Sequence, residues 1–309
     1  MLISEAKVRE ELSFPDAMTV VEHALRESAA GNIENQLRRR VHIGSTALNI
    51  MSAAMPGLRV MGAKVYTTGE RGPNAYFLLF DASGDLLCTM EADELGRIRT
   101  GAVTALATKY LARSDAYEMA LFGTGFQAET QLRAICATRP MRKVKVWSRN
   151  FDKVKGFCSR LEGVVQVDLE PVDDARRAIQ DVGIITTATS SPEPVLFGDW
   201  LEHGVHVNAI GNNRSYEREL DSMVVSKASQ IIVDSTEQAQ SESGDLLLAE
   251  QDGVPVWTRT SELSAILMGN LASARNSDDE ITLFKSNGLA LEDVAVAHHV
   301  YTRIVEGHE

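Results

Sequence analysis

The spacing of apolar residues gives the first part of the chain a mixed helical and extended character. Residues 13–31 repeat apolar positions at helical spacing and predict a helix that Ser13 or Asp16 could cap and that Gly31 ends. Its buried stripe is expected to contain Val20, Val21, Ala24 and Leu25. A second helix is expected at residues 99–112, where small residues would allow close packing.

Short apolar runs between these two helices predict a set of strands. The turn signal at residues 81–85 lies between two apolar runs and predicts a hairpin. Turn residues separate the other runs, which is typical of a sheet built from neighbouring strands. The expected strands lie in residues 38–44, 46–53, 60–68 and 75–91.

From residue 118 the pattern changes to apolar strands that alternate with helices. Residues 118–123 predict a buried strand, 127–139 a helix and 143–150 a second strand. This alternation is typical of βαβ units and of a parallel sheet with both faces covered. Further short strands are expected in residues 181–191, 206–211 and 230–235, and a last amphipathic helix in residues 289–307.

The loop between the strand at 118–123 and the next helix has the pattern of a dinucleotide-binding turn. It reads GTGFQA and supplies Gly123, Gly125 and Ala128, where the third position can be Gly or Ala. Gly123 permits the tight turn, Gly125 allows backbone to approach a pyrophosphate, and Ala128 lets the helix pack on the strand. The pyrophosphate is expected at the helix N-terminus, where free N–H groups favour an anion.

The end of the second strand of this predicted fold indicates which nucleotide binds. NAD sites usually have an acidic residue here, which binds the ribose 2′-hydroxyl. This chain has Ser148, Arg149 and Asn150 instead, with Lys153 one turn further on. A guanidinium group can pair with a 2′-phosphate, so the sequence favours NADP(H), with NAD(H) possible.

Composition narrows the function classes that remain. The 309 residues carry a formal net charge of −12, which argues against nucleic acid and anionic membranes as main partners. No run reaches the length of about 18 apolar residues that a membrane span requires, and we expect no signal peptide. The three cysteines form no disulfide framework or zinc spacing, which fits a reducing cytoplasm and gives no sign of a metal.

Several long stretches resemble the ornithine cyclodeaminase/μ-crystallin family over nearly the whole chain. They include GAKVYTT at 62–68, residues 78–112, GTGFQA at 123–128 and TLFKSNGLALEDVAVA at 282–297. Members of this family include cyclodeaminases, alanine and other amino-acid dehydrogenases, and imine reductases. The resemblance implies an α/β fold in which a Rossmann dinucleotide-binding domain is inserted into a split α+β substrate and dimerisation domain. The expected domains are 1–115 with 290–309 for substrate and dimer formation, and 116–289 for NADP.

The resemblance also implies a basic cluster that binds the carboxylate of the substrate. Lys64 and Arg99 match the lysine and arginine of the family pattern. A third basic residue is expected from the strand at 38–44, where Arg38 fits best and Arg40 lies on the same strand face. Planar guanidinium groups bind a carboxylate with two hydrogen bonds, and an ammonium adds a compact charge.

The loop after residue 211 departs from the cyclodeaminase pattern. Asn213 stands where cyclodeaminases have an aspartate that handles the amino group of the substrate. An amide cannot act as a general base, although it can orient a substrate or a water molecule. The departure favours simple hydride transfer, and the loop RSYERELD resembles that of the μ-crystallin branch, whose members act as ketimine reductases.

The sequence therefore predicts a cytoplasmic, homodimeric, NADP(H)-dependent oxidoreductase. It is expected to transfer hydride between the cofactor and the Cα of an α-imino or α-amino acid, with Lys64 or a water held by Asn213 as proton donor. The alternatives are a cyclodeaminase that uses bound NAD, and a non-catalytic protein that binds NADPH and a small ligand. The expected cofactor-binding residues are Thr100, Gly123, Thr124, Gly125, Phe126, Gln127, Ala128, Ser148, Arg149, Asn150, Lys153, Thr187, Ala188, Thr189, Asn208, Ile210, Gly211, Asn287 and Gly288.

Substrate selectivity is assigned to two loops whose shape the sequence does not define. These are residues 69–75 and 212–218. Glu70, Asn213 and Glu217 could face a basic side chain of the substrate, although solvent exposure is the simpler interpretation of each.

Overall fold

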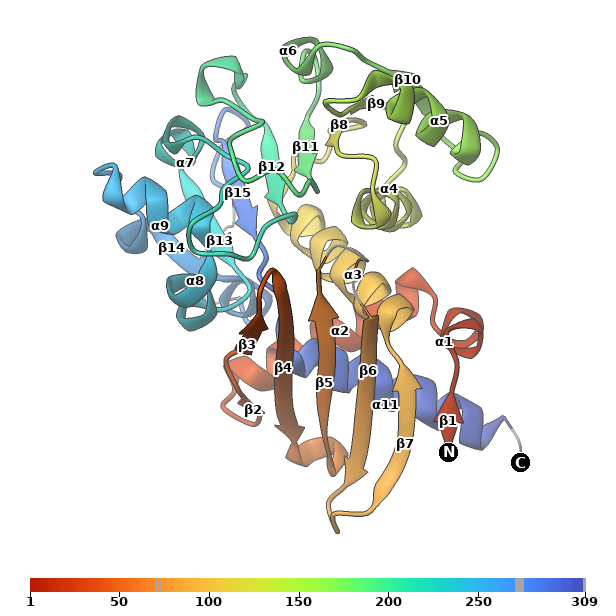
Figure 1. The fold of residues 1–309 in the computed structure, drawn as a ribbon. Coiled ribbons are helices and arrows are strands. Elements are labelled where there is room, and N and C mark those ends of the chain that lie inside the picture. Colours follow the sequence, from red (N-terminus) through yellow and green to blue (C-terminus); the bar gives the residue numbers. More distant parts are fainter. Residues whose placement is uncertain (70–71, 73, 270–274, 308–309) are drawn as a thin grey trace. The chain divides into compact units, whose positions relative to one another are not determined.

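The computed structural model describes residues 1–69, 72, 74–269 and 275–307 (Figure 1). The chain forms two compact units, Met1–Val103 with Gly288–Glu309 (unit 1) and Thr104–Asn287 (unit 2). The chain passes from unit 1 to unit 2 inside helix α3 (Asp93–Leu111), and it returns to unit 1 shortly before helix α11 (Ala290–Glu306). Among the described residues, no helix is both long and apolar enough to cross a membrane.

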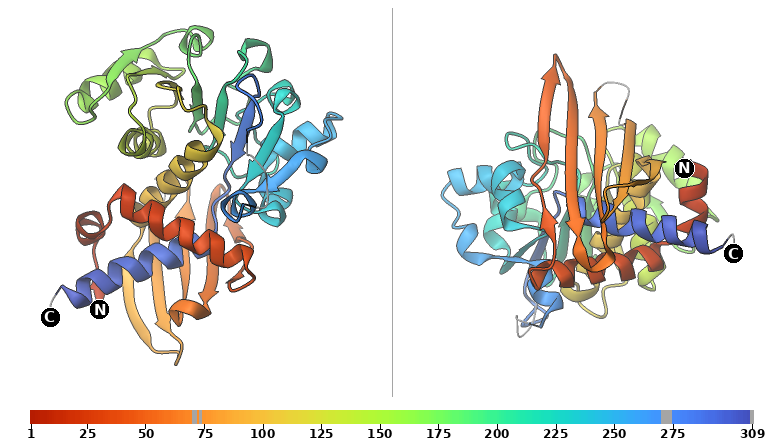
Figure 2. Two further views of the ribbon diagram at one scale, coloured as in Figure 1. Left: turned by 180° about the vertical axis from the view of Figure 1, so that it is seen from behind. Right: turned by 90° about the horizontal axis from the view of Figure 1, so that it is seen from below.

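Unit 1 is built on a sheet whose long strands are antiparallel. The strand order is β1-β7-β6-β5-β4-β2, with β3 also paired to β4, and only β1 runs parallel to its neighbour β7. Helices α2 and α11 pack on each other and lie along one face of this sheet (Figure 2). The strands are β1 (Leu2–Ile3), β2 (Glu34–Asn35), β3 (Arg39–Ile43), β4 (Thr46–Met55), β5 (Val60–Thr68), β6 (Asn74–Asp81) and β7 (Leu86–Glu91). The helices are α1 (Glu5–Glu11), α2 (Phe14–Ala29), the 3-10 turn η1 (Pro56–Leu58), the first part of α3, and α11.

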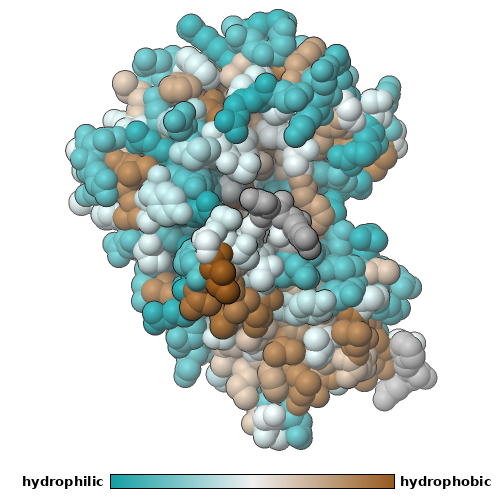
Figure 3. Space-filling view, in the orientation of Figure 1, coloured by the Kyte–Doolittle hydropathy of each residue, from teal (hydrophilic) through white to brown (hydrophobic). Residues whose placement is uncertain are grey.

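Strand β4 shows why this sheet has two different faces. Ala47, Asn49 and Met51 are buried toward the helices, whereas Leu48 and Ile50 lie exposed on the opposite face. Alternate residues of a strand point to opposite faces, so one strand contributes to both surfaces. Apolar residues gather over the strands of unit 1 in the space-filling view (Figure 3). We call this surface the outer face; its exposed apolar residues are Val41, Ile43, Leu48, Ile50, Met61 and Tyr76.

Unit 2 is a parallel sheet with helices between successive strands. Its strand order is β10-β9-β8-β11-β12-β15-β13-β14, and every recorded pairing is parallel. The strands are β8 (Glu118–Phe122), β9 (Lys143–Trp147), β10 (Asp168–Pro171), β11 (Ile184–Thr187), β12 (His206–Ala209), β13 (Gln230–Val233), β14 (Thr260–Glu262) and β15 (Thr282–Lys285). The helices are α4 (Phe126–Thr138), α5 (Phe151–Leu161), α6 (Ala175–Ala178), η2 (Gly198–Trp200), α7 (Ser222–Lys227), α8 (Thr236–Glu242), α9 (Gly244–Gln251), η3 (Trp257–Arg259) and α10 (Leu263–Leu267).

The strand order of unit 2 reverses at β8. From β8 the chain passes outward to β9 and β10, and then returns to β11 on the other side of β8. In open parallel sheets, ligands bind at the carboxyl ends of the strands where the order reverses in this way. The loop after β8 is GTGFQA, so the fold places the predicted nucleotide loop at the switch point. The predicted α/β class with a dinucleotide-binding fold is confirmed.

The structure defines the caps, buried residues and bounds of several predicted elements. Ser13, rather than Asp16, caps α2, because its side chain accepts a hydrogen bond from the backbone N–H of Asp16. In the stripe of α2, Val21 is buried but Val20 is only half-buried. The hairpin predicted at 81–85 joins β6 to β7, and helix α3 begins at Asp93, earlier than expected.

Candidate active site

A pocket of about 510 Å³ lies in unit 2 at the carboxyl ends of β8, β9, β11 and β12. It contains most of the residues that the sequence analysis assigned to the cofactor, although these residues come from four separate loops. The lining residues are Gly123, Thr124, Gly125, Phe126, Gln127, Trp147, Ser148, Arg149, Asn150, Lys153, Ala188, Thr189, Ser190, Val195 and Gly211. We refer to it below as the nucleotide pocket.

Gly123 and Ala128 have the structural roles that the loop pattern predicts. Gly123 has a φ of +121°, which L side chains rarely adopt, and an added Cβ would lie 2.5 Å from the carbonyl oxygen of Ala188. Ala128 is fully buried, and its Cβ would lie 3.5 Å from a Cβ at Gly123. The turn therefore requires a glycine at position 123 and a small residue at position 128.

Gly125 is different, because the protein itself leaves room for a side chain there. Its φ of −87° is open to any residue, and no protein atom lies within 4 Å of an added Cβ. Gly125 is also the N-cap of α4 and lines the pocket, and no side chain caps the first turn of this helix. Uncapped N–H groups at a helix N-terminus bind anions, so the site fits a pyrophosphate that approaches the backbone closely.

The part of the pocket after β9 is basic. Arg149 and Lys153 are both exposed, and within the described part of the chain no ion pair is recorded for either side chain. Asn150 caps α5 by accepting a hydrogen bond from the backbone N–H of Lys153 (3.1 Å). Ser148 donates to the carbonyl oxygen of Asn150 (3.1 Å). None of the described lining residues is acidic, so this end of the pocket has two free cations and no carboxylate.

The other predicted cofactor residues lie outside the lining of this pocket. Thr187 and Ile210 flank lining residues, and the amide nitrogen of Ile210 donates to the carbonyl oxygen of Thr187 (2.9 Å). Asn208 is buried and donates to Thr108 (3.0 Å), within a polar network that includes His206. The backbone N–H of Asn287 donates to the carboxylate of Asp234 (2.7 Å). Thr100 and Gly288 belong to unit 1.

In unit 1, two of the predicted substrate residues form a buried ionic cluster with helix α11. The ammonium of Lys64 lies 2.7 Å from the carboxylate of Asp293. Arg99 donates through Nε to Asp293 (3.0 Å) and through Nη1 to Glu292 (2.8 Å). All four side chains are buried, so β5, α3 and α11 are joined through charged groups in the interior.

Arg38 reaches the same cluster from the segment before β3. Its Nη2 donates to the carbonyl oxygen of Gly288 (3.3 Å), and its charge acts on Lys64. An added Cβ at Gly288, where φ is +79°, would lie 2.7 Å from Nη1 of Arg99. Gly288 thus lies against both guanidinium groups, and its missing side chain leaves space for them. Arg40 instead donates to the side-chain oxygen of Asn49 (3.0 Å).

Burial and neighbouring charges shift the pKa values of Lys64 and Asp293 in this cluster. Burial lowers the pKa of Lys64 to about 8, with a further lowering by Arg99 that the nearby Asp293 opposes. Burial alone would raise the pKa of Asp293, but Arg99 and Lys64 hold it below its usual value. Among the described residues, Arg38, Lys64 and Arg99 bring three basic side chains together at the start of helix α11. Basic groups arranged in this way can bind the carboxylate of a small molecule.

Asn213 and Glu217 belong to the second expected selectivity loop, which lies after β12. Asn213 is half-buried in the loop after β12, and it does not line the nucleotide pocket. Glu217 accepts hydrogen bonds from Arg214 (2.9 Å) and Asn212 (3.0 Å) within the same loop. Glu70 lies outside the described residues.

Three carboxylates in these two sites were not singled out from the sequence. Glu292 and Asp293 follow an apolar residue at the start of α11, where acidic residues look like ordinary favourable partners of a helix N-terminus. The position of these two acidic residues inside the apolar run LALEDVAV is the sequence feature that could have indicated a buried ion pair. Glu219 joins two loops of the nucleotide pocket. No neighbouring residue in the sequence indicates this role, because its partners lie 8 to 32 positions away in the chain.

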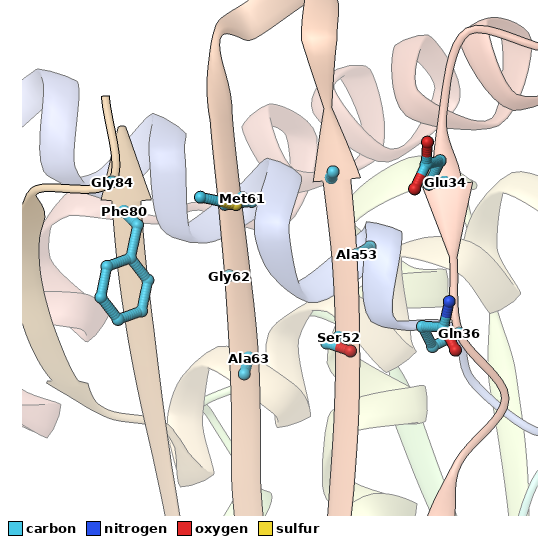
Figure 4. A pocket seen from close by; sticks show the side chains of 10 residues that line it. Glu34, Gln36, Ser52, Ala53, Met61, Gly62, Ala63, Phe80 and Gly84 are labelled. Carbon is cyan, nitrogen blue, oxygen red and sulfur yellow. The ribbon is translucent and has the colours of Figure 1, made fainter. Parts of the chain in front are cut away.

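A second hollow of about 490 Å³ lies beside the outer face of unit 1. Figure 4 shows Met61, Ala63, Ser52 and Phe80 along neighbouring strands at this hollow, with Glu34 and Gln36 at its side. None of the predicted site residues lines it. Among the described residues, no cluster of histidine, cysteine and acidic side chains could hold a metal ion.

Comparisons with known proteins agree over the full length of the chain. A sequence model of the ornithine cyclodeaminase/mu-crystallin family matches residues 1–308. The chain is 34% identical to a Bacillus cereus protein named Delta(1)-pyrroline-2-carboxylate reductase, over 99% of this chain and 97% of that protein.

Two solved structures are similar in sequence and fold. Thermococcus litoralis Delta(1)-pyrroline-2-carboxylate reductase, solved in complex with NADH and L-proline, has a TM-score of 0.96 at 32% identity; the match covers 100% of this chain and 98% of that chain. An archaeal alanine dehydrogenase dimer with bound NAD has a TM-score of 0.92 at 29% identity; the match covers 100% of this chain and 97% of that chain.

Proposed function

This chain belongs to the ornithine cyclodeaminase/mu-crystallin family, and we propose that it reduces a small cyclic α-imino acid, with Δ1-pyrroline-2-carboxylate as the first candidate. It is an NAD(P)-dependent oxidoreductase that acts on C=N or CH–NH2 groups, so the predicted reaction class is confirmed. The specific substrate is taken from the reductases to which the chain is similar. The observation that carries the proposal is the basic cluster of unit 1, in which the half-buried Arg38 joins the buried Lys64 and Arg99.

In this proposal the basic cluster fixes the substrate by its carboxylate. Arg38 donates to the carbonyl oxygen of Gly288, and Arg99 donates to Glu292 and Asp293. These hydrogen bonds orient both guanidinium groups before the substrate arrives. Fixing one end of a small molecule in this way places its C=N carbon, and orientation of this kind supplies much of the rate enhancement of many enzymes. We assign the carboxylate to Arg38 rather than Arg40, because Arg40 is engaged with Asn49.

A nicotinamide cofactor, when bound, would supply the hydride that reduces the C=N carbon. The nitrogen must then gain a proton, and Lys64 is the candidate donor because its pKa of about 8 leaves it protonated but weakly acidic near neutral pH. A water oriented by Asn213 is the alternative donor. After transfer, the neutral Lys64 would regain its proton from solvent.

We propose that NADP(H) is preferred over NAD(H). Support comes from Arg149 and Lys153, which line the nucleotide pocket beside an N-cap asparagine where NAD sites usually have a carboxylate. The two solved structures described above hold NADH or NAD, so the proposed preference for NADP(H) is argued from this chain's own residues.

We also propose a homodimer in which the outer faces of two unit 1 sheets meet. Its support is the set of exposed apolar residues on this face, together with the dimeric state of the archaeal alanine dehydrogenase. A cytoplasmic location is supported by the three cysteines, all of which are free and none of which forms a disulfide in the described chain.

The function is tested by following NADPH and NADH oxidation with Δ1-pyrroline-2-carboxylate, with α-keto acids plus ammonia or methylamine as comparisons. We expect cofactor oxidation coupled to formation of proline. Incubation with ornithine distinguishes the cyclodeaminase alternative, which would release ammonia and form proline with no net oxidation or reduction of its bound NAD. Cofactor binding without turnover on any imine would support the binding-protein alternative and contradict the proposal.

A further inference from the structure

Glu219 is a buried residue whose side chain joins two loops of the nucleotide pocket. It lies after the loop that follows β12 and is 0% exposed. Its Oε1 accepts hydrogen bonds from the backbone N–H and the hydroxyl of Thr189, both at 2.7 Å. Its Oε2 accepts from the hydroxyl of Thr187 (3.0 Å) and from the backbone N–H of Gly211 (2.7 Å). All four donors thus point at one carboxylate.

These bonds connect segments that line the pocket. Thr189 and Gly211 are lining residues from the loops after β11 and β12, and Ala188 lies between the two threonines. The carbonyl oxygen of Glu219 also accepts from the backbone N–H of Val195, a further lining residue (2.8 Å). An added Cβ at Gly211 would lie 2.7 Å from Cδ of Glu219, so the loop approaches the carboxylate as closely as a glycine allows.

Asp245 and Lys285 hold Glu219 from the opposite side. One carboxylate oxygen of Asp245 accepts from the backbone N–H groups of Glu219 (2.7 Å) and Leu220 (2.9 Å). The other oxygen lies 3.0 Å from the ammonium of Lys285, which also donates to the carbonyl oxygen of Asn212. Burial and the neighbouring Asp245 raise the pKa of Glu219, while Lys285 and the bonds from Thr189 oppose this.

We propose that Glu219 is a positioning residue for the cofactor, because its carboxylate fixes the loops after β11 and β12 in the conformation that forms one wall of the nucleotide pocket. Nothing in this role requires Glu219 to touch the cofactor. The inference rests on the proposed nucleotide-binding function of this pocket. It adds that cofactor affinity depends on the buried carboxylate of Glu219, which does not line the pocket.

The substitution Glu219→Gln tests this role with little change of shape. A neutral amide has one acceptor oxygen and one NH2 group, whereas each carboxylate oxygen of Glu219 accepts from a backbone N–H. Whichever way the amide is turned, its NH2 group faces the N–H of Thr189 or that of Gly211. One loop must therefore lose its anchor, while the volume of the side chain is preserved.

The matched control is Asp221→Asn. Asp221 lies in the same unit and also accepts two backbone N–H groups, from Gly198 and Val224, both at 2.9 Å. Neither of these residues lines the nucleotide pocket. Both donors bond to the same oxygen of Asp221, so the amide of Asp221→Asn can still accept from them. This variant removes a carboxylate charge without releasing a loop, and a loss of cofactor binding is expected only in Glu219→Gln.

The first measurement is the dissociation constant of NADPH, and of NADH, by fluorescence titration. We expect Glu219→Gln to weaken binding by about tenfold or more, the range for losing one hydrogen bond to a buried charge. The Michaelis constant for the imino acid, measured at saturating cofactor, should not change, because Arg38, Lys64 and Arg99 are untouched. Hydrogen exchange in the cofactor-free protein should speed up at the amide of Thr189 or Gly211 and remain unchanged in Asp221→Asn.

A second pair of variants covers the case in which Glu219→Gln does not fold. Thr187→Val removes one donor to the carboxylate, and Thr187→Ser retains it. We expect weaker cofactor binding in the valine variant and near wild-type binding in the serine variant. If wild type, Glu219→Gln and Thr187→Val bind the cofactor equally well, the inference about Glu219 is wrong, while the proposed function is unaffected. A wild-type protein that binds neither NADPH nor NADH would overturn the proposed function as well.

Discussion

The position of Lys64, the proposed proton donor, changes the pH range in which this residue is protonated. It is buried beside Arg99, and both conditions disfavour the ammonium form, so its pKa falls to about 8. Asp293 limits the fall by pairing with the charged form. The residue therefore loses its proton near the upper end of the physiological range, whereas an exposed lysine would remain charged there.

We predict that kcat/KM for imine reduction decreases as the pH rises through about 8. Below this pH Lys64 is protonated and can both attract the carboxylate and donate a proton; above it, both contributions disappear. The oxidation of the amino acid should show the opposite trend, since it needs the neutral amine as a base. The measurement is a pair of pH–rate profiles, one for each direction.

The control for this profile is Lys64→Arg, which retains the charge but does not titrate in the same range. Its activity should be low and should lack the decrease near pH 8. A decrease that persists unchanged in Lys64→Arg would originate in the substrate and would contradict the assignment.

The proposed preference for NADP(H) depends on Arg149. We predict that wild type binds NADPH more tightly than NADH and that Arg149→Ala removes most of the difference. A charge-assisted hydrogen bond is worth about 1.5–3 kcal/mol, or roughly tenfold to more than a hundredfold in affinity. Lys155→Ala is the control, because Lys155 lies on the same helix α5 but pairs with Asp152 (2.8 Å) and does not line the pocket. Equal wild-type affinities for the two cofactors would contradict the prediction.

At the scale of elements, the residue that precedes α11 affects both the path of the backbone and the position of Arg99. Gly288 precedes this helix with a φ of +79°, and a side chain there would meet Arg99. Arg99 could not turn aside easily, because Glu292 and Asp293 of the same helix hold its guanidinium group. One glycine therefore determines both how the chain enters α11 and whether the arginine can remain in place.

We predict that Gly288→Ala raises the Michaelis constant for the imino acid and destabilises the protein. The control is Gly31→Ala, because Gly31 follows α2 in the same unit with a φ of +78° and no atom within 4 Å of an added Cβ. Both variants should lose about 1–2 kcal/mol of stability from the left-handed conformation. Only Gly288→Ala should weaken substrate binding, and equal Michaelis constants in the two variants would refute the steric argument.

Elements with a strong local pattern could be predicted from the sequence, whereas their order in the sheet could not. The turn at 123–128 and the strand before it are defined by residues next to one another, so both elements could be predicted where the structure has them. Strand β15 was not expected, because Thr282–Lys285 has only four residues and its local pattern does not mark it as a strand. It nevertheless lies between β12 and β13, where all four of its residues are buried.

The same distinction separates the predicted site residues from those that were missed. Lys64 and Arg99 were assigned to the substrate site through family motifs, but their partners Glu292 and Asp293 are about 200 residues away in the chain. Glu219 is similar, since its role depends on two loops that approach each other only in the folded sheet. Interactions between distant segments require the sheet order, which local patterns do not contain.

At the scale of the whole molecule, the two faces of the unit 1 sheet raise the question of assembly. One face is covered by α2 and α11, and the outer face presents Ile43 at 88% and Val41 at 64% exposure. Natural sheets seldom leave a broad apolar surface in water, because it promotes association. Stable protein interfaces bury more than about 1,000 Å² in total, and several adjacent strands offer a surface of this kind.

We predict that the protein is a dimer at micromolar concentration and that the double substitution Val41→Glu and Ile50→Glu converts it to a monomer. Both side chains lie on the outer face, on the paired strands β3 and β4, so a dimer formed there would bury like charges from two chains. Val164→Glu in unit 2 is the control, since Val164 is also about half exposed, at 51%, but lies elsewhere. Light scattering measures the mass of each variant, and thermal unfolding shows whether the monomer remains folded. A monomeric wild type, or a double variant that stays dimeric, would place the interface elsewhere or remove it.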